Sequence, residues 1–325
     1  MKTETKLSGF AKYAWFVLAY NVVVILWGVF LRASKSGDGC GQHWLTCHGE
    51  VIPSAPQLKT VIEFSHRLTS GIAFIVVLFL VIWAFRKFEK GHIIRKTAVI
   101  SFIFIITEAL VGAGLVLTGN TAEALTAARP FWMAGHLINT FILLAFLSLT
   151  AWFASGGKSD FKFQPKVLLC LILAIVGILF VGISGSIAAL SSMIFPSTTL
   201  AEGVASDFAE TSHILLRLRV SHPILSIMVG VFIIFLAGWL KSMAKDDSSV
   251  NRWANVLSIL ILIQFAWGAA TLLTLAPIVM QLVHLFLADA VWIAFVLMSA
   301  SFLALPELFP AGEVRDKSPA SFNHI

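Results

Sequence analysis

The sequence predicts an all-α integral membrane protein with eight transmembrane helices, arranged as two tandem pseudo-symmetric four-helix bundles. Three observations carry this prediction. Of the 325 residues, 58% are hydrophobic and 12% are charged, which is too little polar surface for a water-exposed body. Eight apolar runs are long enough to cross a bilayer as helices. The last four runs repeat the loop lengths, and part of the sequence, of the first four.

The eight apolar runs are separated by short polar connections. At about 1.5 Å of rise per residue, a helix of about 20 residues crosses the hydrocarbon core. The first run continues into a loop without a small-residue cleavage site, so we expect a retained anchor and not a signal peptide. The expected spans are 13–31, 66–85, 97–118, 132–153, 167–190, 213–240, 253–275 and 281–305.

Basic residues gather in the two tails and in the even-numbered loops, whereas loop 191–212 has no Lys or Arg. Because basic loops stay in the cytoplasm, we expect both termini to be cytoplasmic in a multi-pass protein of the cell membrane. The net charge of +6 is therefore interpreted as a topology signal, and no nucleic-acid partner is expected. The basic residues in question are Lys2, Lys6, Lys12, Arg86, Lys87, Lys90, Arg95, Lys96, Lys158, Lys162, Lys166, Lys241, Lys245, Arg252, Arg315 and Lys317.

A weak internal repeat supports the division into two bundles. The segment 109–118 of the third span resembles 265–274 of the seventh, and a histidine follows each after an outer loop. The outer loops run long, short, long, short in chain order. We therefore expect an N-terminal bundle over 1–157 and a C-terminal bundle over 158–325, each with a similar pocket.

Four histidines lie near the outer ends of the even-numbered spans: His66, His136, His222 and His284. Imidazoles inside a membrane are costly and usually have a partner or a function. Facing helices would bring His66 to His136 and His222 to His284, which suits a haem iron with two axial histidines. A role in helix packing is the alternative for any single histidine. His213 is expected to be interfacial.

A non-haem metal is the main competing interpretation. Glu63-x-x-His66 has the spacing found in di-iron carboxylate bundles. That site needs the motif twice, and the second half has Arg219-x-x-His222 instead. A zinc site would need three clustered ligands, which the sequence does not supply. The pattern favours haem.

Glu63, His66 and Arg67 share one face of the expected second helix. Arg67 suits a haem propionate, because a planar guanidinium binds a carboxylate through two hydrogen bonds. Glu63 could accept a proton or stabilise positive charge developing on a substrate. The alternative for Glu63 is a charge that only favours the helix N-terminus.

Cys40 and Cys47 lie in the first outer loop, where a disulfide is plausible. Such a bridge would be either a structural staple or redox active, and both interpretations are kept. Cys170 lies in an apolar span and is interpreted as inert packing.

The string 36–47 with its two cysteines and tryptophan, the Glu63–Arg67 motif, and one histidine per even-numbered span resemble the haem A synthase family over the whole chain. The resemblance implies oxidation of the C8 methyl of haem O to a formyl group, giving haem A for haem-copper oxidases. It implies substrate haem between His66 and His136, and a haem b cofactor between His222 and His284. It also implies a catalytic role for Glu63 and a redox or haem-transfer role for the cysteine pair.

The implied partners are haem O as substrate, a haem O synthase as donor, the oxidase assembly machinery and membrane lipid; a homo-oligomer is left open. Three departures from the family pattern affect this interpretation. Leu45 replaces an expected proline, loop 191–212 lacks a cysteine pair, and Pro223 replaces the arginine after the histidine. If the halves align, Arg219 stands in the place of Glu63. Arg217 and Arg219 are then candidates for binding propionates, together with Arg67.

Two other functions explain part of the pattern. A di-haem b-type cytochrome for quinol electron transfer explains the four histidines, but not Glu63 or the cysteine loop. A non-enzymatic haem carrier or oxidase assembly factor predicts haem exchange without product. Glu108 and Asp289 lie within spans, where they would form a proton route or hydrogen-bond inside the bundle, and the second is favoured.

Overall fold

The computed structural model describes residues 7–245 and 247–305, and these form ten helices. Eight helical segments are long and apolar enough to span a membrane, with α7 and α8 together making the sixth, so the prediction of eight spans is confirmed. Lys2, Lys6, Arg315 and Lys317 lie outside the described residues. The bounds are α1 (Gly9–Ala33), α2 (Leu58–Lys87), α3 (Ile93–Leu117), α4 (Arg129–Ala154), α5 (Pro165–Ile194), α6 (Leu200–Phe208), α7 (Ile214–Arg219), α8 (Ser221–Met243), α9 (Ser248–Leu273) and α10 (Ile278–Leu303).

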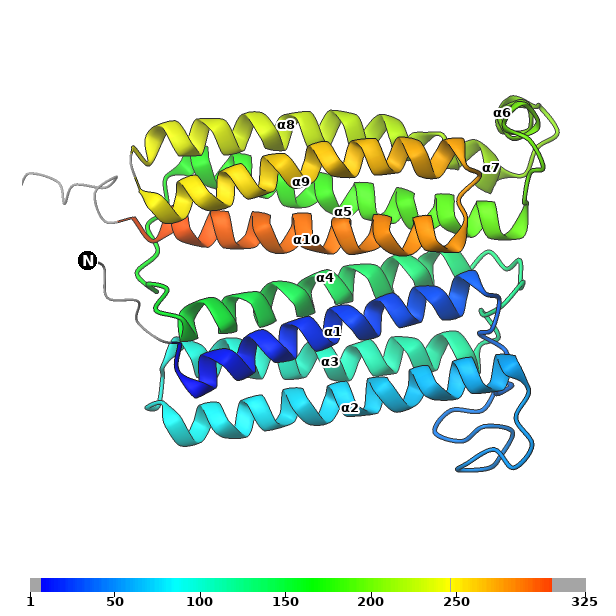
Figure 1. The fold of residues 1–325 in the computed structure, drawn as a ribbon, viewed down its shortest axis with the longest axis horizontal. Helices are drawn as coiled ribbons and strands as arrows, with labels where there is room; N and C mark the ends of the chain where they lie inside the picture. Colours follow the sequence, from blue (N-terminus) through cyan, green and yellow to red (C-terminus); the bar gives the residue numbers. More distant parts are fainter. Residues whose placement is uncertain (1–6, 246, 306–325) are drawn as a thin grey trace, which may run out of the picture.

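The long helices run side by side, with α1 to α4 on one side and α5 with α7 to α10 on the other (Figure 1). α4 and α10 meet in the middle, where the indole Nε1 of Trp292 donates to the carbonyl of Phe141 at 2.7 Å. The two rings also stack, with centroids 5.4 Å apart. This contact joins the two groups of helices into one body.

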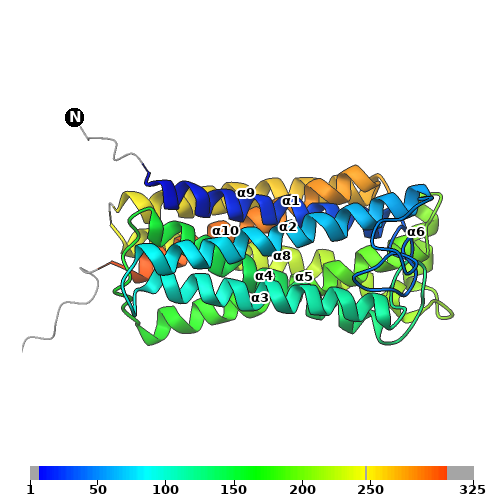
Figure 2. The same cartoon turned by 90° about the horizontal axis from the view of Figure 1, so that it is seen from below.

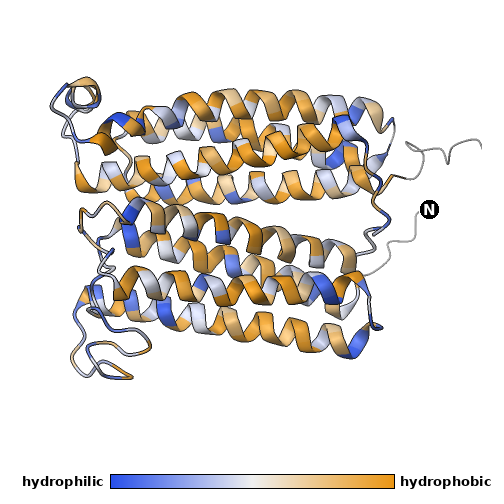
Figure 3. Cartoon of the chain, turned by 180° about the vertical axis from the view of Figure 1, so that it is seen from behind, coloured by the Kyte–Doolittle hydropathy of each residue, from blue (hydrophilic) through white to orange (hydrophobic). Residues whose placement is uncertain are grey.

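The ends of the bundle differ in character. α1 begins and α10 ends at one end, while loop 34–57 and α6 lie at the other (Figures 1 and 2). We name this second end, which carries Cys40 and Cys47, the cysteine-loop end. Apolar residues dominate the long helices, and polar residues gather toward their ends (Figure 3). This distribution is what a membrane requires, because backbone polar groups are paired inside the helices and apolar side chains face lipid.

Helix boundaries follow local chemistry. The Ser8 hydroxyl accepts the backbone N–H of Ala11 at the start of α1, and the Asp247 carboxylate accepts two backbone N–H groups at the start of α9. Such caps satisfy donors that have no partner in the first turn. After α4, Gly156 adopts a left-handed backbone with φ of 100°, which ends a helix at little steric cost.

The structure differs from the expected spans at two places. The sixth span is interrupted at Val220, between α7 and α8, because Pro223 has no N–H and its ring obstructs the carbonyl of Arg219 four residues earlier. Loop 191–212 contains α6, capped by the Thr199 hydroxyl, which accepts the backbone N–H of Glu202. The interruption at Val220 places the start of α8 at Ser221, so that His222 lies in the first turn of this helix.

Candidate haem-binding site

One large cavity of about 2130 Å³ lies between the helices and is lined by both halves of the chain. His66, His136, His222 and His284 all line it. Pockets for drug-sized ligands are typically about 300–1,000 Å³, so this volume is sufficient for more than one large ligand. The four histidines that the sequence singles out therefore share one cavity that is large enough for more than one large ligand.

The C-terminal pair faces across this cavity. The ring centroids of His222 and His284 are 6.1 Å apart and the rings are perpendicular, at 89°. A metal bound to one nitrogen of each ring at about 2 Å needs ring centres about 6 Å apart. The Ser184 hydroxyl lies 3.2 Å from Nδ1 of His222 and orients that ring. The pair thus fits an iron held between two axial imidazoles.

Three of the histidine rings rest on glycines of neighbouring helices. A Cβ added at Gly28 would lie 3.0 Å from Cε1 of His66, and one at Gly185 would lie 2.9 Å from Cε1 of His222. A Cβ at Gly268 would lie 3.0 Å from Cε1 of His284. These contacts are tighter than ordinary carbon–carbon packing at about 3.5–4.0 Å, so only glycine leaves each imidazole in its position.

His136 is held differently, by a carboxylate on α3. Its Nδ1 lies 3.1 Å from Oε1 of Glu108, within ion-pair distance although the alignment falls short of a full hydrogen bond. Glu108 also accepts hydrogen bonds of 2.5 Å from Asn139 and Thr140 on α4. Glu108 is thereby fixed beside His136, which agrees with the expectation that it hydrogen-bonds within the bundle.

The ring nitrogens also fit a metal ligand. In His66, His136 and His284 the buried nitrogen without a hydrogen-bond partner is Nδ1. Nε2 of His66 and of His136 is then the nitrogen left to bind a metal, whereas Nε2 of His284 also lies 3.5 Å from Nε2 of Gln264. Within residues 7–245 and 247–305, no cluster of three or more His, Cys, Asp or Glu side chains could hold a metal ion. The donors present are the four imidazoles that line the cavity, of which His222 and His284 face each other.

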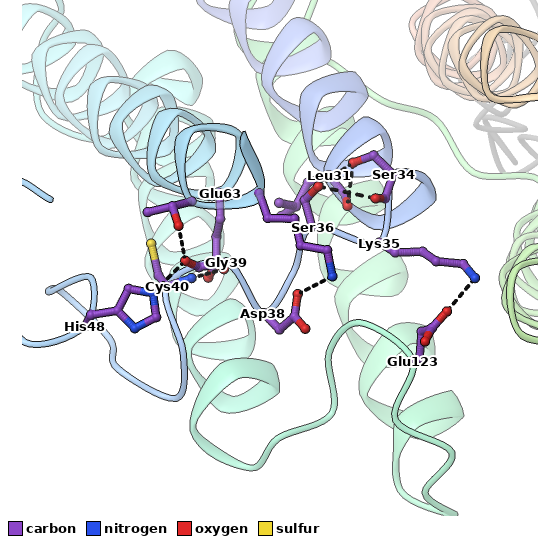
Figure 4. A network of polar contacts seen from close by, with 12 residues as sticks. Leu31, Ser34, Lys35, Ser36, Asp38, Gly39, Cys40, His48, Glu63 and Glu123 are labelled. Carbon is purple, nitrogen blue, oxygen red and sulfur yellow. Dashed lines mark hydrogen bonds and ion pairs between the residues drawn. The ribbon is translucent and has the colours of Figure 1, made fainter. Parts of the chain in front are cut away.

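Glu63 lies at the cavity wall with 2% of its surface exposed. Its Oε2 accepts the backbone N–H of Cys40 at 2.8 Å, and its Oε1 accepts Nη2 of Arg67 at 2.5 Å. Arg67 also donates through Nη1 to the carbonyl of Thr46 at 2.7 Å. Figure 4 shows Glu63 reaching the cysteine loop from α2. The carboxylate is fixed one helical turn from His66, where it can stabilise positive charge in the cavity.

The cysteine loop is closed by a Cys40–Cys47 disulfide and packs on the first turn of α2. The Gly39 carbonyl accepts the Thr60 hydroxyl at 2.7 Å and lies 2.9 Å from Nε2 of His48. A Cβ at Gly39 would lie 2.3 Å from the backbone of Lys59, so no other residue fits there. The disulfide therefore helps to hold in place the backbone N–H of Cys40, which donates a hydrogen bond to Glu63.

Comparison with known proteins identifies the relationship. Residues 11–296 match the model of the COX15-CtaA family, described as cytochrome oxidase assembly protein. The chain belongs to this family. The resemblance inferred from the sequence is thereby confirmed at the level of the family.

Three relatives illustrate the match. A protein named protoheme IX farnesyltransferase from Thermus thermophilus is 45% identical over 304 residues, which are 93% of this chain and 50% of the relative. This chain thus spans half of that protein. The heme A synthase of Shouchella clausii is 29% identical over 261 residues, covering 78% of this chain and 83% of the relative. The heme A synthase of Halalkalibacterium halodurans is 38% identical over 127 residues, covering 39% of this chain and 42% of the relative.

Five arginines are placed near the cysteine-loop end, and their surroundings differ. Arg67 and Arg219 line the cavity, but each has an acidic partner: Glu63 for the first and, at 2.5 Å, Asp207 for the second. Arg217 does not line the large cavity and instead donates to backbone carbonyls of the α6–α7 connection. The two remaining arginines are Arg32 and Arg129, which both line the cavity.

Sequence reasoning missed Arg32 and Arg129, although a signal for them exists. Both lie at the membrane end that has fewer Lys and Arg than the other, at the end of α1 and the start of α4. A basic residue that opposes the charge bias of its side is not needed for topology. Such a residue is therefore a candidate for ligand binding.

Asp289 on α10 is another carboxyl of the cavity wall, with 1% of its surface exposed and no hydrogen-bond partner for either oxygen. The expected hydrogen bond within the bundle is not made in this structure. His213 caps α7, with Nδ1 accepting the backbone N–H of Leu215 at 3.2 Å, and Cys170 is a free, half-buried thiol.

Proposed function

We propose that this chain is a haem A synthase that oxidises the C8 methyl of haem O to a formyl group. The observation that carries the proposal is the difference between two pockets built on equivalent histidine pairs. Glu63 and Glu108 flank the N-terminal pair, whereas Arg219 and Gln264 occupy the matching sequence positions of the C-terminal half. Carboxylates at these two positions can stabilise positive charge on a reacting ligand, and the C-terminal pair has an arginine and an amide there, which suits a resident cofactor.

In this proposal residues 1–157 bind the substrate haem at His66 and His136, and residues 158–325 bind a haem b at His222 and His284. Haem b, when bound, supplies one-electron transfer. We also propose that both termini are cytoplasmic and that the cysteine loop faces the outside of the cell membrane. The charge bias of the loops supports this orientation.

The chain's own residues act by position and charge. Glu63 is fixed by Arg67 and by the N–H of Cys40, so its carboxylate needs no reorganisation when charge develops beside it. Glu108 orients His136 through Nδ1, as carboxylates commonly orient metal-binding histidines. The Cys40–Cys47 disulfide holds the loop that supplies the N–H to Glu63.

The Thermus relative supports a partner for this chain. Its name is that of an enzyme that farnesylates protohaem, and this chain covers only half of its length. Farnesyl transfer to protohaem is the step that yields haem O. We propose that a haem O synthase delivers substrate to this chain, and that the product goes to the assembly of haem-copper oxidases.

The test is haem analysis after expression of the full chain with a haem O synthase in a host that makes no haem A. Haem A or its hydroxylated precursor is expected with the wild type. Glu63→Gln should abolish both products while haem O remains bound, because the substitution removes charge but keeps the shape. The control is Arg86→Gln, an exposed residue at the opposite end.

A haem-loaded wild-type protein that yields only haem B and haem O would contradict the proposal and support the cytochrome or the carrier. Full activity in Glu63→Gln would instead contradict only the role of Glu63.

A further inference from the structure

We propose that Arg32 and Arg129 form a carboxylate clamp for the two propionates of the porphyrin bound between His66 and His136. The inference rests on the proposed function and extends it to the orientation of the substrate. It assigns a ligand class, a paired carboxylate, to a part of the cavity that neither the family match nor the related proteins describe.

The first argument is position along the helices. Arg32 lies four residues after Gly28, the residue on which His66 rests, so the two share a face of α1. Arg129 lies seven residues before His136 on the same face of α4. At about 1.5 Å per residue, Arg32 lies about 6 Å beyond Gly28 and Arg129 about 10 Å beyond His136, both toward the cysteine-loop end. The two arginines thus stand beyond the histidines at one end of the same pocket.

The second argument is charge. Among residues 7–245 and 247–305, no carboxylate lies within ion-pair distance of Arg32 or Arg129. Arg129 has 3% of its surface exposed; its Nη1 donates to the Ala124 carbonyl at 2.7 Å, and its Nε has no partner. Both guanidinium groups line the same cavity. A cation that lines a cavity without a carboxylate partner is costly, for Arg129 above all because it is buried, and an anionic ligand with two carboxylates would reduce that cost.

The third argument is that the second pocket has no such pair. The residue four positions after Gly185 is Ala189, and the residue seven positions before His284 is Pro277. Neither can bind an anion through its side chain. The clamp is therefore a property of the N-terminal pocket, and it distinguishes the porphyrin bound there from the one bound by His222 and His284.

The clamp has a consequence for the reaction. The C8 methyl of haem O shares its pyrrole ring with a propionate, so fixing the propionate edge also fixes that methyl near the cysteine-loop end. Glu63 lies one turn from His66 in that same direction. Arg32 and Arg129 would thereby determine specificity, because they would orient the porphyrin so that its C8 methyl, and not another edge of the ring, faces the carboxylate of Glu63.

The test is porphyrin binding without turnover. Ferric protohaem and its dimethyl ester, in which both propionates are neutral, are titrated into the detergent-solubilised full chain. Binding at the N-terminal pair is the Soret change that disappears in His66→Ala. Arg32→Gln and Arg129→Gln should each weaken protohaem binding about tenfold to a hundredfold, the effect of losing a charge-assisted hydrogen bond. Both variants should bind the ester as the wild type does.

Two further variants sharpen the comparison. Arg32→Lys, which keeps the charge but not the planar fork, should fall between wild type and Arg32→Gln. Arg86→Gln, a basic residue at the opposite end, should change nothing. An unchanged spectrum of the C-terminal haem shows that each variant is folded.

The clamp is overturned if the variants bind protohaem like the wild type, or if they weaken protohaem and ester equally. It is also overturned if the wild type binds the ester as tightly as protohaem, because the arginines would then pair with another anion such as a lipid phosphate. A wild type that binds no porphyrin at His66 and His136 would instead contradict the proposed function itself.

Discussion

A single methyl group at Gly185 would test whether the cavity positions its histidines for a metal. In Gly185→Ala the new Cβ would lie 2.9 Å from Cε1 of His222. Ordinary carbon–carbon contacts are about 3.5–4.0 Å, so the imidazole would have to move by about 0.6–1 Å. Sites of this kind function within about 0.5 Å of their productive geometry. The substitution therefore exceeds the tolerance of an iron ligand while changing no polar group.

The assay is haem content and the low-spin optical and EPR spectrum of the purified protein. We expect Gly185→Ala to lose the C-terminal haem, or to show an altered low-spin signal, because the shift would also break the 3.2 Å contact of His222 with Ser184. Helix weakening cannot explain such a loss, since alanine favours a helix over glycine by about 1 kcal/mol. Gly238→Ala is the control, on the same helix as His222 but with open space around the new methyl.

The reasoning is refuted if Gly185→Ala binds haem at the C-terminal site with the wild-type spectrum. The same outcome would show that the contact with Gly185 does not position His222. A loss that is equal in Gly238→Ala would show that α8 does not tolerate added volume in general, and would count against the specific contact.

Three further predictions concern charged and amide side chains. Glu108→Gln should raise the midpoint potential of the N-terminal haem by about 60 mV, since a tenfold change in equilibrium is about 59 mV per electron. The reciprocal substitution, Gln264→Glu, should lower the midpoint potential of the C-terminal haem. Equal potentials in Glu108→Gln and wild type would contradict the contact of Glu108 with His136. Asp289→Asn should keep both haems and not lower the melting temperature, because its carboxyl has no partner to lose, and haem loss would contradict this. Hydrogen bonds from Thr198 lower the pKa of Glu202, so Glu202→Gln should reduce the melting temperature above pH 4.5. The difference from wild type should vanish as the pH falls through the lowered pKa. A difference that grows in acid would contradict the prediction.

The number and order of the spans could be predicted from the sequence because apolar length alone determines them. The interruption at Val220 was not predicted, although its cause is local: Pro223 removes one backbone donor within a run that hydropathy treats as continuous. α6 was missed because nine residues in a polar loop give a weak periodic signal. Composition predicts which segments enter the membrane, but not where the backbone inside them breaks.

The site was predictable to the extent that its contacts are local. The pairing of Glu63 with Arg67 follows from a separation of four residues on one helix. The N–H of Cys40 comes from 23 residues away through a folded loop, and spacing does not predict it. The contact of His136 with Glu108 joins two helices, and their rotation about their own axes is set by packing.

The two pockets differ in how they hold their histidines, and this difference agrees with one exchanged and one resident haem. In the C-terminal half both rings rest on glycine, at Gly185 and Gly268. In the N-terminal half the position that matches Gly268 in the repeat is Gly112, which has no heavy atom within 4 Å of an added Cβ, and His136 is held by a carboxylate instead. Close packing on both ligands restricts movement in the C-terminal pocket. Open space beside one ligand, with polar groups fixing the rest, is what the proposed exchange of substrate and product in the N-terminal pocket requires.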